Sequence, residues 1–146
     1  MLLMNILIGF FALTACLLVQ ALLLKMAIRY YASEEEHLGD GPWATYRILC
    51  SVVMLLVIGN LLQVAVWAVV FIFLGEFSDF ATAYYHSAVN FATLGYGDIV
   101  MSEKYRLLGP LESINGILMV GITTAALMSV VSQVMKIGLE RSDESD

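Results

Sequence analysis

Thr93-Leu94-Gly95-Tyr96-Gly97-Asp98 fits no regular element, and it lies between two segments that are apolar enough to cross a membrane. Glycine reaches positive φ without steric cost because it has no Cβ, so Gly95 and Gly97 allow successive carbonyl groups to alternate in direction. Rows of backbone carbonyls can replace the hydration shell of an ion. The stretch therefore predicts an extended ion-coordinating loop, with a hydroxyl from Thr93 at its inner mouth and a carboxylate from Asp98 at its outer mouth.

The composition is typical of a membrane protein. Of the 146 residues, 60% are hydrophobic and only 14% are charged, which is too apolar for a soluble domain of this size. A helix needs about 20 apolar residues to cross the hydrocarbon core, and residues 2–28, 48–74 and 107–134 are long enough. The third segment is the most polar, with Glu112, Asn115, Thr123, Thr124, Ser129, Ser132 and Gln133. We expect it to face water or protein and to line a pore, since unpaired polar groups are costly in lipid.

The segment before the loop, residues 80–92, is helical in composition but too short to cross a membrane. It can only enter and return, which is tolerated where protein or a water-filled cavity surrounds it. Ser78 or Asp79 is the expected N-cap. If the helix ends near Ala92, the negative end of its dipole points at the centre of the pore and stabilises a cation there.

The motif TLGYGD, residues 93–98, resembles the signature sequence of potassium channels, and residues 48–137 resemble the pore domain of that family. The resemblance implies that the carbonyls of Thr93, Leu94, Gly95 and Tyr96, together with the Thr93 hydroxyl, bind K+ in a selectivity filter that Gly97 completes. K+ is then the permeant ion, and no cofactor is expected.

The expected fold is all-α, with three transmembrane helices, a re-entrant pore helix and an extended selectivity filter. The predicted parts are a peripheral transmembrane helix at 1–30, an acidic cytoplasmic loop at 31–46, the pore domain at 47–137 and a short acidic cytoplasmic tail at 138–146. One chain supplies only one filter strand, whereas four strands give about eight carbonyl oxygens around each ion. We therefore expect a homotetramer in a lipid bilayer.

Basic residues near the ends of the spans predict the orientation of the chain. Those on one side are Lys25, Arg29, Arg47, Lys136 and Arg141, and those on the other are Lys104 and Arg106. This distribution favours a cytoplasmic C-terminus, an external N-terminus and a filter that opens outward. A compact multi-pass chain of this kind indicates the plasma membrane, and specifically a bacterial inner membrane.

Acidic residues gather near the outer mouth of the predicted pore. They are Glu76, Asp79, Asp98, Glu103 and Glu112. Repeated around a symmetric assembly, they predict a negative vestibule that concentrates cations. Glu103 by itself is better explained as a residue that keeps a loop solvated.

The surroundings of the filter depart from the family pattern. Tyr85 and His86 stand where many potassium channels carry two tryptophans, and Val89 stands where some relatives hold a carboxylate partner for the filter aspartate, so Asp98 lacks that partner. We expect His86 to lie near Tyr96 of a neighbouring chain and to bond its hydroxyl. The alternatives are a purely structural His86 and one whose protonation near its reference pKa of about 6.5 alters the filter.

Two glycines in the third span compete for a gating role. Gly121 is similar to the inner-helix glycine that is often assigned as a gating hinge, and Gly116 is the rival hinge. Both can instead serve close helix packing.

The first span is expected to be a retained helix rather than a signal peptide, because no Lys or Arg precedes Lys25 and the apolar run is long. We expect it to pack outside the pore domain against the second span, with Thr14 and Gln20 bonding a neighbouring helix. It lacks the repeated arginines of a voltage sensor. Cys16 and Cys50 are both expected to be inert buried thiols rather than a disulfide.

A passive potassium-selective channel is the leading interpretation. The alternatives are a weakly selective cation channel, in which the loop has lost rigidity, and a non-conducting modulatory membrane subunit. An enzyme is not expected, because no Ser or Cys nucleophile has a base nearby. No basic run indicates a nucleic-acid partner, and no cluster has metal-ligand spacing.

Overall fold

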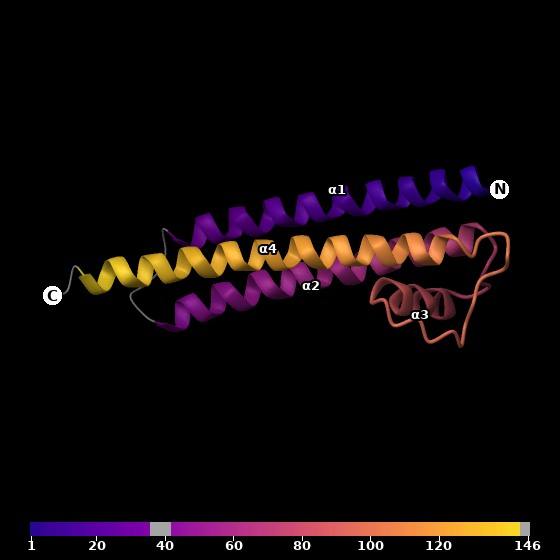
Figure 1. The fold of residues 1–146 in the computed structure, drawn as a ribbon. Coiled ribbons are helices and arrows are strands. Elements are labelled where there is room, and N and C mark those ends of the chain that lie inside the picture. The colour runs from indigo at the N-terminus through magenta and orange to yellow at the C-terminus, as the bar shows by residue number, and fades with distance from the viewer. Residues whose placement is uncertain (36–41, 144–146) are drawn as a thin grey trace.

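Three long helices run side by side, and one short helix packs against one end of them (Figure 1). The computed structural model describes residues 1–35 and 42–143, and the side-chain surroundings of residues 1–29, 47, 50–132 and 135. The helices are α1 (Leu2–Glu35), α2 (Pro42–Phe73), α3 (Phe80–Phe91) and α4 (Leu108–Asp143). Over the residues described there is no strand, which confirms the prediction of an all-α protein.

Helices α1, α2 and α4 are each long and apolar enough to cross a membrane. Their apolar cores are Leu2–Arg29, Cys50–Phe73 and Leu108–Ser132, close to the predicted spans. All three helices continue beyond these cores at the end away from α3 (Figure 1). The predicted loop at 31–46 is therefore largely helical, as is most of the predicted tail at 138–146. The remaining parts of both, residues 36–41 and 144–146, lie outside the described residues.

The two ends of α2 follow from local chemistry. Proline suits the first position of a helix because its missing N–H would have no helical partner there, and α2 begins at Pro42. At the other end Gly75 has φ 76°, its N–H bonds the Ile72 carbonyl, and the N–H of Glu76 bonds the Phe71 carbonyl. This is a Schellman motif, which ends a helix with one residue in the left-handed conformation.

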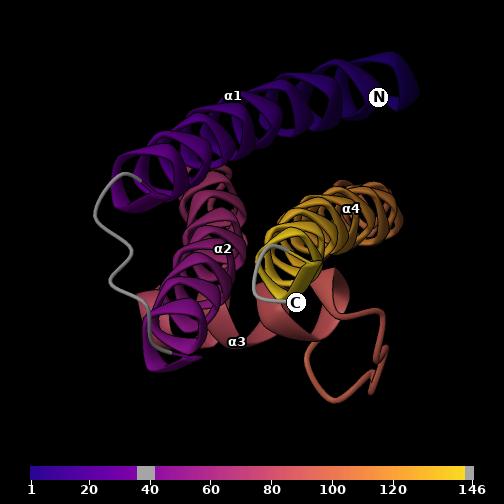
Figure 2. The same ribbon diagram turned by 90° about the vertical axis from the view of Figure 1, so that its left-hand side faces the viewer.

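Helix α1 crosses the pair formed by α2 and α4 (Figure 2). Near the N-terminus Gly9 lies against Leu111 of α4, and farther along Leu23 lies against Gly59 of α2. The absence of a Cβ at both glycines allows this close approach. Helix α1 thus packs on the second span, as the sequence predicted, and on α4 as well.

A chain of side-chain hydrogen bonds joins the three long helices midway along their length. Gln63 of α2 donates to Gln20 of α1 over 2.7 Å, and Gln20 donates to Thr123 of α4 over 3.1 Å. The predicted interhelical role of Gln20 is confirmed. That of Thr14 is wrong, because its hydroxyl donates to the Phe10 carbonyl of its own helix.

Candidate functional site

Helix α3 begins at the N-cap that the sequence predicted. Asp79 has extended dihedral angles, and its side chain accepts a 2.9 Å hydrogen bond from the Thr82 N–H. Hydrogen bonds from Thr82 lower the pKa of Asp79 below its ordinary value, since they stabilise the charged form. The cap therefore carries a negative charge at the positive end of the helix dipole.

The other end of α3 closes with the same motif as α2, but with threonine in the glycine position. The Thr93 N–H bonds the Asn90 carbonyl and the Leu94 N–H bonds the Val89 carbonyl, both over 2.9 Å. Thr93 has φ 58°, the one non-glycine residue at positive φ in the described part of the chain. A β-branched residue is a genuine outlier there, and such strain costs about 1–3 kcal/mol and is found at functional sites.

Positive φ recurs at every second residue of the motif. The angles are 58° at Thr93, 60° at Gly95 and 72° at Gly97. A Cβ added at either glycine would meet nothing within 4 Å, so the glycines are required by conformation and not by lack of space. Residues 93–97 thus alternate between positive and negative φ.

Tyr85 holds the outer end of the loop onto α3. Its hydroxyl donates a 2.7 Å hydrogen bond to Oδ2 of Asp98. This bond lowers the pKa of Asp98 and raises the pKa of Tyr85, because it favours the charged carboxylate and the neutral phenol. Val89 offers Asp98 no carboxylate partner, as the sequence indicated, but Tyr85, one helical turn earlier, supplies a hydroxyl instead, which the sequence did not predict.

His86 is buried beneath the loop, and both of its ring nitrogens are bonded within the chain. Nδ1 lies 3.0 Å from the Ile99 carbonyl and Nε2 lies 2.9 Å from Nδ2 of Asn90. A carbonyl can only accept and an amide NH2 can only donate, so these partners specify the neutral ring with its proton on Nδ1. The expected bond to a neighbouring Tyr96 hydroxyl has no free ring nitrogen to use.

Aromatic rings pack His86 in place. Its ring centroid lies 5.5 Å from that of Phe71 and 5.0 Å from that of Phe77. Burial lowers the pKa of His86 below its ordinary value, against opposing contributions from the Ile99 carbonyl and from the charges of Asp98 and Glu76. The ring is therefore held neutral.

A carboxylate ties the chain that follows the motif to the end of α2. Glu76 accepts hydrogen bonds from the Ser102 N–H and the Ser102 hydroxyl, both over 2.6 Å. The sequence offered no signal for this pair, since the residues lie 26 positions apart. The irregular chain after Asp98 is thus fixed at its far end as well.

Glu112 does not lie at the outer mouth. Its side chain is 0% exposed, and Ser87 of α3 donates a hydrogen bond to its Oε1. The prediction that Glu112 adds charge to an outer vestibule is wrong, because the residue faces the interior of the chain. Asn115, one turn later, is also fully buried, so these polar groups of α4 face protein and not a pore.

Helix α4 clamps the carboxyl end of α3. Ser113 donates a 2.8 Å hydrogen bond to the Asn90 carbonyl. A Cβ added at Gly116 would lie 2.0 Å from the Phe91 carbonyl oxygen, whereas one added at Gly121 would meet nothing within 4 Å. The two glycines therefore differ: Gly116 permits a close approach between the helices, and Gly121 is unobstructed.

A cavity of about 200 Å³ lies behind the motif. Gly95 and Gly97 form one wall, His86 and Asn90 of α3 form another, and Gly109 and Pro110 of α4 close it. Among the described residues no group of three or more His, Cys, Asp or Glu side chains could hold a metal ion. Cys16 and Cys50 are both free thiols; Cys16 is buried as predicted, whereas the prediction that Cys50 is buried is wrong, because it lies exposed near the start of the second span.

Three apolar helices, with an irregular loop held between a short helix and the third of them, define a multi-pass membrane protein. A family model described as "Ion channel" matches residues 60–133. The match covers just over half of the chain, which therefore belongs to the ion channel family. It begins within α2 and ends within α4, so α1 lies outside it. A search of curated proteins found no match, and neither did a search of solved structures.

Proposed function

We propose that the chain is the subunit of a passive potassium-selective channel. The observation that carries the proposal is the alternation of positive φ at Thr93, Gly95 and Gly97. Peptides that alternate in this way can present a row of carbonyl oxygens to one axis, and such oxygens replace the water around a desolvated K+ ion. In this proposal Thr93, Leu94, Gly95 and Tyr96 bind K+, and Thr93 also contributes its hydroxyl.

The exposure of the motif supports a homotetramer. Leu94 is 53% exposed and Tyr96 is 64% exposed in the single chain, although neither residue type favours water. One strand cannot surround an ion, whereas four strands related by a fourfold axis can. Neighbouring copies would cover Leu94 and Tyr96 and leave the carbonyls facing the axis.

Helix α3 would act as a re-entrant pore helix. Asn90 and Phe91, in its last turn, are held by Ser113 and Gly116 of α4, so the direction in which the last carbonyls point is fixed. Four such helix ends would place partial negative charge near the axis, where an ion is least solvated. The peptide dipoles need no reorganisation when an ion arrives.

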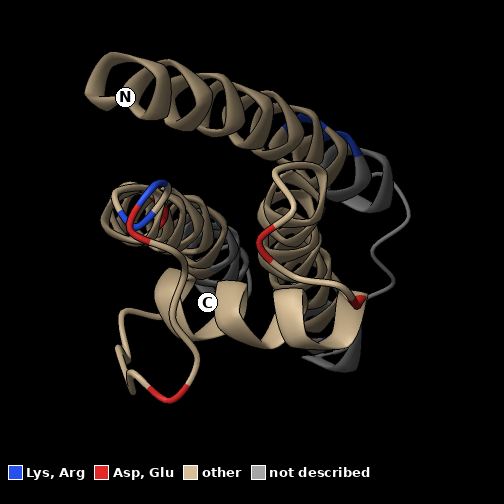
Figure 3. Ribbon diagram, turned by 90° about the vertical axis from the view of Figure 1, so that its right-hand side faces the viewer, with Lys and Arg blue, Asp and Glu red and all other residues tan. Residues whose placement is uncertain are grey.

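Charge at the two ends of the molecule supports an outward-facing filter. Figure 3 shows acidic residues in the loops around α3, and basic residues both in the loop before α4 and on α1 toward its far end. Asp79 and Asp98 have lowered pKa values and so remain charged at the outer mouth. Lys25 and Arg29 would lie on the cytoplasmic side, with the N-terminus outside, in a plasma membrane of the bacterial inner-membrane type.

Within the pore domain at 47–137, Gly121 is the better candidate for a gating hinge. Gly116 is engaged with Phe91, so bending there would disturb the end of α3. A bend at Gly121 would leave that contact intact and move the part of α4 that follows. Gating would then change the inner mouth while the filter keeps its geometry.

Reversal potentials test the proposal. Current through the purified chain in planar bilayers, with high K+ and low Na+ on one side and low K+ and high Na+ on the other, should reverse near the K+ equilibrium potential. Gly95→Ala should abolish selective current because alanine is strained at φ 60°. Gly75→Ala is the matched control, since Gly75 has φ 76° with nothing within 4 Å but lies outside the filter.

Each other outcome has a distinct meaning. A reversal potential near zero would indicate a weakly selective cation channel instead of a potassium-selective one. A stable homotetramer without current under any condition would instead favour a modulatory subunit. Chemical cross-linking in detergent measures the oligomeric state independently of conduction.

A further inference from the structure

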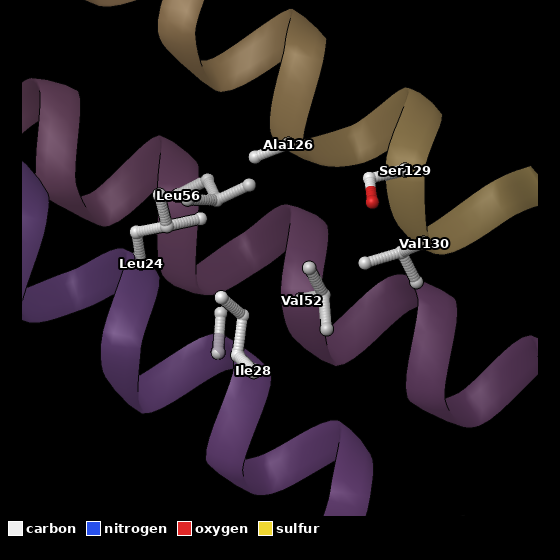
Figure 4. Close-up of a pocket in the computed structure, with 8 residues that line it drawn as sticks. Leu24, Ile28, Val52, Leu56, Ala126, Ser129 and Val130 are labelled. Carbon is white, nitrogen blue, oxygen red and sulfur yellow. The ribbon is translucent and has the colours of Figure 1, made fainter. Parts of the chain in front are cut away.

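A cavity of about 250 Å³ lies between the three long helices at the end away from α3. Figure 4 shows side chains of all three helices directed into it. They include Leu24 and Ile28 of α1, Val52 and Leu56 of α2, and Ala126 and Val130 of α4. Ser129 is the exception in a lining that is otherwise apolar, so the cavity suits hydrocarbon rather than a polar ligand.

The path of α1 explains why the space is left open. Gly9 places α1 against α4 near the N-terminus, the Gln20 hydrogen bonds hold all three helices together midway, and Leu23 then follows α2. Beyond that point Ala27 of α1, Val52 and Leu56 of α2 and Val130 of α4 form one buried apolar cluster around the cavity. Ala27 and Ala126, which line the gap, are too small to fill it.

The cavity lies at one edge of the apolar cores. Its lining residues fall in the last turns of Leu2–Arg29, the first turns of Cys50–Phe73 and the last turns of Leu108–Ser132. This is the depth at which hydrocarbon gives way to headgroups. A chain entering here would come from the adjoining leaflet.

Two cations stand beside this edge. Lys25 and Arg29 follow the lining residues Leu24 and Ile28 directly in sequence, lie one helical turn apart and are exposed. Long basic side chains at a span end extend toward the headgroups, and basic groups between helices on the cytoplasmic side bind anionic headgroups. Apolar lining and positive charge are thus neighbours on the same stretch of α1.

We propose that this cavity binds an acyl chain of an anionic phospholipid whose phosphate is held by Lys25 and Arg29. A helix of a second copy is about 10 Å wide and does not fit a space of about 250 Å³, whereas a segment of one hydrocarbon chain does. The site depends on α1, which lies outside the residues matched by the ion channel family. The proposal depends on the orientation given under the proposed function for one point only, the assignment of the lipid to the cytoplasmic leaflet.

Native mass spectrometry of the purified full chain tests the site. Phosphatidylglycerol and phosphatidylcholine with identical acyl chains are supplied at equal concentration in detergent, and we expect preferential retention of phosphatidylglycerol. Lys25→Gln and Arg29→Gln should each reduce that preference about fivefold, since a basic group near the headgroups contributes about one factor of that size. Lys104→Gln with Arg106→Gln, at the other end of the molecule, should leave it unchanged.

A second variant tests the acyl chain separately. Ala126→Leu fills the cavity and should reduce retention of both lipids severalfold, whereas Ala21→Leu on the exposed surface of α1 should not. If Ala126→Leu does not fold, the two charge variants still decide the question. Loss of the oligomer with unchanged lipid retention in Ala126→Leu would overturn the proposal and assign the cavity to a neighbouring copy.

Three further results would also overturn the proposal. They are an unchanged preference when both charges are removed, equal retention of the two lipids by the wild type, and displacement of phosphatidylglycerol by inorganic phosphate alone. The last would indicate an anion site without an acyl chain. Lipid retention is read in detergent without any current, so its failure is distinguishable from a failure of potassium selectivity.

Discussion

The Tyr85 hydroxyl lies 2.7 Å from Oδ2 of Asp98 and donates a hydrogen bond to it. The two residues are 13 positions apart, one on α3 and the other at the end of the irregular loop. This bond holds the loop to α3 at Asp98, and the Schellman motif holds the loop to the end of α3 at Thr93. The loop is thus attached to the same short helix at both ends.

Removal of the Tyr85 hydroxyl should change the acid titration of Asp98. Tyr85 lowers the pKa of Asp98, so the carboxylate contributes stability that is present above the ordinary value of 3.8 and is lost as pH falls through its lower folded value. In Tyr85→Phe the pKa should rise toward 3.8, and the loss of single-channel conductance should begin at higher external pH. Identical conductance profiles between pH 3 and 6 would contradict this role.

His86 should make the protein less stable in mild acid. Its folded pKa lies below the ordinary value of 6.5, so the unfolded chain takes up a proton before the folded chain does. Stability should therefore fall as pH drops below about 6.5, until the folded pKa is reached. Thermal unfolding in detergent from pH 8 to pH 5 should show this slope in the wild type and a smaller slope in His86→Phe.

Gly116 and Gly121 should respond oppositely to alanine. At Gly116 the new Cβ meets the Phe91 carbonyl, and the displacement should cost about 1–3 kcal/mol and disturb ion selectivity. At Gly121 there is room, so alanine should stabilise the helix by up to about 1 kcal/mol and shift open probability. Denaturation midpoints measure the change in stability of each variant, and single-channel records measure its selectivity and open probability. A Gly116→Ala channel with normal stability and selectivity would show that the close contact of Gly116 with Phe91 does not hold the end of α3.

Replacement of Thr93 by glycine should raise the stability of the protein and lower its selectivity for K+. A non-glycine residue in the left-handed region costs about 1–2 kcal/mol, so Thr93→Gly should raise the free energy of unfolding by about that amount. It also removes the hydroxyl proposed to bind K+, and selectivity should fall. Thr93→Ser keeps the hydroxyl and is the control. A Thr93→Gly channel with unaltered reversal potential would show that the hydroxyl is dispensable.

Features set by local sequence were predictable. The three spans follow from long apolar runs, the N-cap of α3 from Asp79, and the bends of the motif from Gly95 and Gly97, since each depends on residues close together in the chain. The positive φ of Thr93 was not predictable, because threonine disfavours that region. It is imposed by the end of α3.

Features that depend on helix packing were missed. An acidic residue near a span end gives no sign of which way it faces, so Glu112 was placed at the outer mouth although it lies against Ser87. The partner of Asp98 was likewise sought at Val89, because sequence spacing does not specify which side of α3 the loop returns along. The packing of α3 against α4 decides the first, and the path of the loop along α3 decides the second.

The hydrogen bonds of Gln20 constrain how the protein is made. Its two partners, Gln63 and Thr123, lie 43 and 103 residues farther along the chain. Helix α1 is synthesised first, yet this glutamine cannot complete its interhelical bonds until the last span has also entered the bilayer. An amide without partners is unfavourable in hydrocarbon. Helix α1 must therefore stay near the site of insertion until α4 has entered the bilayer. Only then can α1, α2 and α4 complete the hydrogen bonds that join them.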